Sequence, residues 1–101
     1  MPGQSKTLVQ DTAQATGVIV GLPWHTALLK ARLSSAGGSA TVVVYGYVGA
    51  DDSAPSTIAT FTLSGANDHA EWLIDGEPWS HLRADITAIA GGATATCSMG
   101  Y

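Results

Sequence analysis

Charged residues are scarce in this sequence. They make up 12% of the 101 residues, which is about half the share of an ordinary soluble domain. The 4 Lys and Arg against 8 Asp and Glu leave a net charge of −4, whereas nucleic acids and anionic membranes bind basic surfaces. We therefore expect neither as a partner. A surface so poor in charge favours a protein that works in contact with other proteins, although a small β domain with a Thr/Ser-rich surface fits the same composition.

Cysteine and long apolar runs are nearly absent as well. Cys97 is the single cysteine, so an internal disulfide is excluded and folding in a reducing compartment, such as a bacterial cytoplasm, is expected. Cys97 alternates with Met99 on the apolar face of a predicted strand, which indicates a buried, inert thiol. The longest apolar runs fall short of the roughly 18 residues of a membrane-spanning helix, so the sequence predicts no such helix.

Residue types that catalyse reactions or bind metals lack a recognised spacing. The three histidines are His25, His69 and His81, and no H-x-H, H-E-x-x-H or C-x-x-C pattern is present. The acidic residues fall mostly in or beside turns, where they are common as solvated turn formers. We predict no catalytic residue, no metal site and no cofactor, and we expect that the protein is not an enzyme.

Two stretches of the chain repeat each other. Residues 6–24 (KTLVQDTAQATGVIVGLPW) and 61–79 (FTLSGANDHAEWLIDGEPW) match at seven of 19 positions when set 55 apart. The register then slips by one residue, so that AGG at 36–38 falls on AGG at 90–92 and Gly46-Tyr47 falls on Gly100-Tyr101. The sequence therefore predicts one supersecondary unit used twice.

Each copy contains apolar residues at every second position. Residues 40–48 (ATVVVYGYV) are the clearest strand and are apolar on both faces, which predicts a central strand. Residues 26–33 alternate as well, and this favours a strand over the alternative of a short helix. Four strands per copy and turns every 8–12 residues predict an all-β fold, an eight-stranded antiparallel β-sandwich or a jelly-roll-like barrel.

The whole chain of 1–101 is expected to be one domain. We divide it into an N-terminal arm at 1–5, a first pseudo-repeat at 6–47, a linker loop at 48–60 and a second pseudo-repeat at 61–101. The arm is polar and contains Pro2 and Gly3. It is expected to be disordered or to become ordered on a neighbouring subunit.

Exposed aromatics and the arm are the candidate contacts with other proteins. Trp24 and Trp79 each follow a Gly-x-Pro turn, where a ring either closes one end of the sandwich or binds a partner. The full set of interaction candidates is Trp24, Trp79, Tyr45, Tyr47, Tyr101, Pro2 and Gln4.

The last third of the chain resembles small virion proteins of tailed bacteriophages. Those chains often end with an aromatic residue, a strand reading like I-x-A-x-I, a Gly-rich turn and a Thr-rich strand ending in Met-Gly. The matching residues here are Trp79, Arg83, Ile86, Thr87, Ile89, Gly91, Gly92, Thr94, Thr96, Met99 and Gly100. The resemblance covers about 30 residues and carries no catalytic residue.

The resemblance implies a capsid decoration (cement) protein. Such a protein is made in the bacterial cytoplasm and binds the major capsid protein on the capsid surface of the virion, and we expect it to be a homo-oligomer, a dimer or a trimer. The alternatives are a carbohydrate- or receptor-binding β-sandwich that uses Trp24 or Trp79, and a head–tail or tail component. A small enzyme is the least favoured interpretation.

Overall fold

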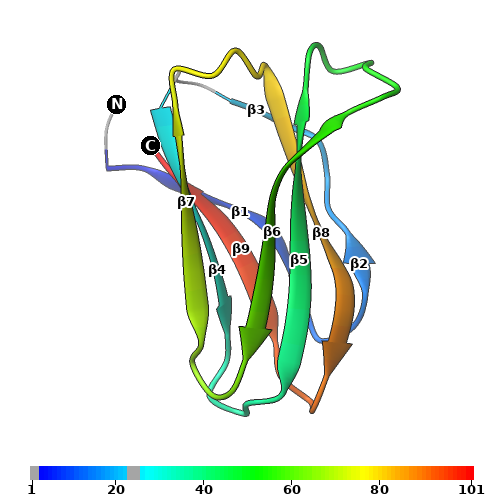
Figure 1. Ribbon diagram of the computed structural model, residues 1–101, viewed down its shortest axis with the longest axis vertical. Helices are drawn as coiled ribbons and strands as arrows, with labels where there is room; N and C mark the ends of the chain where they lie inside the picture. Colours follow the sequence, from blue (N-terminus) through cyan, green and yellow to red (C-terminus); the bar gives the residue numbers. More distant parts are fainter. Residues whose placement is uncertain (1–2, 23–25) are drawn as a thin grey trace.

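Nine β-strands follow one another along the described chain (Figure 1). The computed structural model describes residues 3–22 and 26–101. The strands are β1 (Ser5–Asp11), β2 (Ala15–Thr16), β3 (Val20–Gly21), β4 (Thr26–Leu33), β5 (Ser39–Tyr47), β6 (Ser56–Ser64), β7 (His69–Asp75), β8 (His81–Ala90) and β9 (Ala95–Gly100). Within the described residues, no helix has the length and apolarity needed to cross a membrane.

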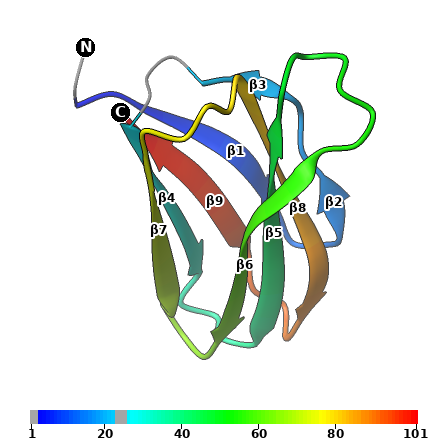
Figure 2. The same cartoon turned by 45° about the horizontal axis from the view of Figure 1, so that its top comes forward.

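The strands form two antiparallel sheets. Sheet A has the order β1-β9-β4-β7, and sheet B has the order β2-β8-β5-β6 with β3 also paired to β8. Figure 2 shows the two layers, with β7 at one end of sheet A and β6 in sheet B. The predicted all-β antiparallel sandwich is confirmed, and the two separate sheets distinguish it from a closed barrel.

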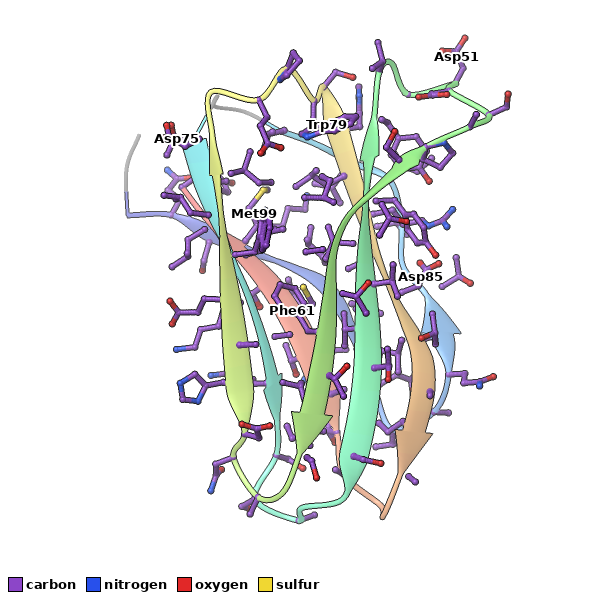
Figure 3. The ribbon with its side chains drawn as sticks, in the orientation of Figure 1. Asp51, Phe61, Asp75, Trp79, Asp85 and Met99 are labelled. Carbon is purple, nitrogen blue, oxygen red and sulfur yellow. The ribbon has the colours of Figure 1, made fainter. Side chains whose placement is uncertain are left out.

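Alternating side chains build the core between the sheets. Every second residue of β4 is buried, with Leu29 and Ala31 at 0% exposure, so this segment is a strand as its period of two predicts. β5 lies between β8 and β6 as the predicted central strand, and Val42 and Val44 are fully buried. Phe61 lies in the middle of the molecule (Figure 3) and joins the same core from β6.

The predicted number of eight strands is wrong by one, because the stretch 13–20 forms two short strands. At Gly17 the chain runs against β8, and the Gly17 N–H donates to the Ala84 carbonyl at 3.1 Å. A Cβ at position 17 would collide with that carbonyl oxygen, so only glycine permits this approach. The strand breaks there into β2 and β3.

Two predicted boundaries also need correction. The linker predicted at 48–60 includes the first half of β6, which begins at Ser56. The arm predicted at 1–5 is partly a strand, because Ser5 pairs with Gly100 and the backbones of Gln4 and Tyr101 exchange hydrogen bonds of 2.7 and 2.8 Å. Gln4 therefore extends sheet A within the chain.

The strand order has a symmetry that follows the sequence repeat. The equivalent strands of the two copies are β1 and β6, β2 with β3 and β7, β4 and β8, and β5 and β9. Replacing each strand of sheet A by its equivalent turns the order β1-β9-β4-β7 into β6-β5-β8-β2, which is the order of sheet B read from its other edge. A duplication of a four-strand unit would produce this relation. Close superposition of the two halves stays a prediction.

Candidate functional site

The two candidate tyrosines of β5 surround an arginine of β8. Arg83 is opposite Tyr45 in the strand register, and its guanidinium carbon lies 4.8 Å from the centroid of the Tyr45 ring and 5.9 Å from that of Tyr47. Arg83 Nε and Nη2 each donate to a carboxylate oxygen of Asp85 at 3.0 Å. We call these four residues, Tyr45, Tyr47, Arg83 and Asp85, the arginine cluster.

The charged groups of Arg83 and Asp85 are paired with each other within the protein. The side chains of Arg83 and Asp85 are only 25% and 13% exposed, and Asp85 Oδ1 also accepts the Gly17 N–H at 3.1 Å. Tyr47 is 2% exposed, so it offers no surface to a partner. Figure 3 places Asp85 beside β8 and β2. The cluster connects β5, β8 and the chain after β2, which indicates a structural role.

Trp79 is built into one end of the sandwich. Its ring packs so closely on Gly46 that a Cβ there would lie 2.5 Å from the Trp79 Cδ2 atom. The indole Nε1 donates to Glu77 Oε2 at 2.7 Å, so its one polar group is already satisfied. This half-buried position (Figure 3) corresponds to the end-closing role rather than to a free binding surface. Trp24 and Pro2 lie outside the described residues.

The remaining two candidates lie where the chain ends meet. Gln4 is exposed and Tyr101 is half-buried, and their backbones pair with each other as described above. Tyr101 also packs against the hydrophobic core. The structure therefore brings Gln4 and Tyr101 together, but it places them away from the arginine cluster on the other sheet.

An apolar surface that the sequence reasoning missed lies on the outer side of sheet A. Leu28 of β4 and Leu73 of β7 are opposite each other in register and are 39% and 56% exposed. Gly100 of β9 pairs with Leu28 on its other side and adds no side chain. We call Leu28, Leu73 and Gly100 the leucine face. The alternation of apolar residues predicts that Leu28 and Leu73 each point outward. It does not show that they lie next to each other, because that depends on the register between β4 and β7.

Polar pairs border the leucine face along both strands. On one side Thr26 Oγ1 donates to Asp75 Oδ1 at 3.4 Å. On the other, Lys30 Nζ lies 3.7 Å from Glu71 Oε1, with both side chains nearly half exposed. An apolar centre with a polar border is the usual arrangement of a protein–protein contact.

Trp72 of β7 provides a second apolar surface, on the other side of sheet A from the leucine face. It is opposite Leu29, whose side chain points into the core, so Trp72 lies on the inner side of β7. It is nevertheless 45% exposed, because β7 is the last strand of sheet A. The unpaired edge of β7, together with Trp72, is called the β7 edge below.

Among the described residues, two ionisable groups have a perturbed pKa. Burial raises the pKa of the Cys97 thiol from 9.0 to about 12, so the thiol stays protonated near neutral pH. The backbone N–H groups of Ala54 and Val48 donate to Asp52 and lower the pKa of that carboxyl. Across residues 3–22 and 26–101, no three His, Cys, Asp or Glu side chains gather in a way that could hold a metal ion.

Comparison with known proteins gives one structural likeness. No protein-family model matches the sequence, and no curated protein matches it. The fold resembles the crystal structure of the SPBc2 prophage-derived protein YomS, with a TM-score of 0.59 over 100% of this chain and 96% of that chain. The two sequences are 14% identical over this match, so the likeness shows a shared fold.

Proposed function

We propose that this chain is a non-enzymatic structural protein of a tailed-phage particle and acts there as a capsid decoration (cement) protein. In this role it binds the major capsid protein on the outside of the head and stabilises contacts between capsid subunits. The observation that carries the proposal is the leucine face. Two leucines lie side by side on an outer sheet surface whose other side chains are mostly Thr, Ser and paired charges.

Two further observations support a phage structural role. The fold is similar to that of a prophage-derived protein, YomS, and the C-terminal third resembles small virion proteins in its sequence. The core is filled by the protein's own side chains, whereas the leucine face adds nothing to it. Two exposed leucines that lie side by side outside the core are explained if they bind a partner.

The contact would be weak for one copy and strong for many. Covering an exposed leucine contributes about 1–2 kcal/mol, so the two leucines of one copy give a modest affinity. A capsid offers the same site many times, and subunits tied together by many copies separate less readily. The decoration protein then raises the temperature at which the shell opens without any covalent step.

The test is binding to empty shells of the major capsid protein. We expect the protein to cosediment with the shells and to raise their opening temperature. The double variant Leu28→Thr/Leu73→Thr should weaken binding at least tenfold, because threonine keeps the strand propensity but removes the apolar contact. Val48→Thr changes a side chain that is 70% exposed elsewhere and serves as the matched control. Shells that neither bind the protein nor gain resistance to heat would reject the proposal.

A further inference from the structure

The backbone of β7 carries unused hydrogen-bonding groups. Leu33 N–H donates to the Asp68 carbonyl at 2.8 Å, and these two residues continue the register of β4 with β7. In an antiparallel ladder hydrogen-bonded pairs alternate, so Ala70, Trp72 and Ile74 direct their backbone groups to β4. The backbone groups of His69, Glu71, Leu73 and Asp75 then point away from sheet A, and no described strand pairs with them. Of these groups the His69 N–H donates to Asp68 Oδ1 at 3.0 Å, and that exposed bond would have to be exchanged on pairing.

This edge carries the charged residues Glu71 and Asp75 but lacks the other usual protections against pairing. Natural edge strands are kept short, interrupted by proline or a bulge, or given inward-pointing charges. One edge of sheet B is protected in this way, because it is made of the two-residue strands β2 and β3. In contrast, β7 has seven residues in a continuous register with β4, contains no proline and has apolar inward positions at Ala70, Trp72 and Ile74.

We propose that the β7 edge binds the β7 edge of a second copy of this chain, in an antiparallel arrangement whose twofold axis passes through Trp72. The two copies of sheet A become one continuous sheet. This interface is distinct from the binding of capsid proposed above, and it does not depend on that function.

The sequence of β7 selects this register. When the axis passes through Trp72, His69 lies opposite Asp75 of the second copy, so an imidazole faces a carboxylate at each end. Glu71 lies opposite Leu73 of the second copy, which avoids a carboxylate pair. An axis through Leu73 would place Glu71 opposite Asp75 of the second copy, and an axis through Glu71 would place two Glu71 carboxylates together. Like charges directly opposite each other destabilise a strand pair.

The same register matches the free backbone groups and the exposed apolar side chains. The residues that pair across the axis, His69 with Asp75 and Glu71 with Leu73, are the four whose backbone groups point outward. This pairing allows about six new hydrogen bonds, and about two more if the His69 N–H groups exchange their bonds to Asp68 Oδ1. The two Trp72 rings meet on the inner side and cover surface that is 45% exposed in one copy. The two leucine faces come to lie on one side of the extended sheet, so a dimer presents twice the apolar surface.

The oligomeric state tests the proposal first. Sedimentation equilibrium should give twice the 10.3 kDa chain mass at tens of micromolar protein. Glu71→Pro should return the mass to that of one chain, because proline removes an outward N–H and leaves the β4 ladder intact. Thr62→Pro is the matched control, because it also removes an outward N–H from an edge strand. The Gly65 N–H donates to the Gly38 carbonyl, so the alternation along β6 directs the Thr62 N–H away from β5. A wild-type protein that is monomeric at these concentrations would overturn the proposal.

A cross-link tests the register even if a proline variant folds poorly. Two residues at position 72 would form a non-hydrogen-bonded pair with Cα atoms about 4.5 Å apart, within the range of a disulfide. Trp72→Cys should therefore form a disulfide-linked dimer in air, whereas His69→Cys should not, because its symmetry mate lies about 20 Å away. The absence of the Trp72→Cys dimer, or equal cross-linking of both variants, would contradict the assigned register. Shell binding is measured separately, so failure of either proposal leaves the other open to its own test.

Discussion

Cys97 is the single residue whose chemistry the fold changes most. Its side chain is 0% exposed, and burial raises its pKa from 9.0 to about 12. The folded protein therefore holds the thiol proton over a pH range in which the unfolded chain releases it. Because the folded state binds more protons there, the free energy of unfolding should fall as the pH rises from about 9 to about 12, by up to about 1.4 kcal/mol per pH unit.

Urea denaturation at a series of pH values checks this effect. The slope of the free energy of unfolding against pH is compared with that of Cys97→Ala, which keeps every other ionisable group of the protein. The variant should lose part of the decline with pH, because it has no thiol to ionise. Equal slopes for the two proteins would show that Cys97 does not contribute.

Sequence patterns anticipated the residues of regular strands better than those at close contacts. Cys97 and Met99 were expected on an apolar face, and both are buried. Trp79 could be assigned either to the end of the sandwich or to a partner. The deciding contact is with Gly46, 33 residues earlier in the chain, and neither residue's local sequence indicates it.

The arginine cluster acts at the scale of strands, because it joins β5, β8 and the chain after β2. Arg83→Met keeps most of the side-chain length but leaves Asp85, which is 13% exposed, without its cation. We expect the free energy of unfolding to fall by about 2–3 kcal/mol, since an ion left without its partner in a mostly buried position is costly. Chemical denaturation monitored by tryptophan fluorescence measures the loss.

The exposed pair between Lys30 and Glu71 provides the control for this variant. Its charged groups are 3.7 Å apart and nearly half exposed, so Lys30→Met should cost less than about 1 kcal/mol. If both substitutions destabilise the protein equally, the arginine cluster has no special role in connecting the strands.

At the scale of elements, the sequence predicted continuous strands more accurately than interrupted ones. β4 and β5 follow from the alternation of apolar residues and from the glycines between them. The division between β2 and β3 depends on the contact of Gly17 with the backbone of Ala84, and the sequence repeat hid it because β7, at the equivalent place, is continuous. The leucine face was missed because register between β4 and β7 is needed to bring Leu28 next to Leu73.

At the scale of the whole molecule, the repeat in the sequence and the strand order describe the same relation. Each four-strand unit contributes to both sheets, because the units exchange strands across the sandwich. The two halves nevertheless differ at their edges. β2 and β3 form a short, broken edge, whereas β7 forms a continuous edge with exposed Trp72 and Leu73. The β7 edge is therefore better suited to pairing than the edge formed by β2 and β3, and the leucine face lies beside it.

The central claim is that the chain is a structural part of a phage particle, and the particle itself tests it most directly. Phage particles released from cells that carry the gene for this chain would be purified through a density gradient and their proteins quantified by mass spectrometry. The account predicts many copies per particle in a fixed ratio to the major capsid protein. Particles that lack the chain, while it accumulates free in the infected cell, would contradict the account.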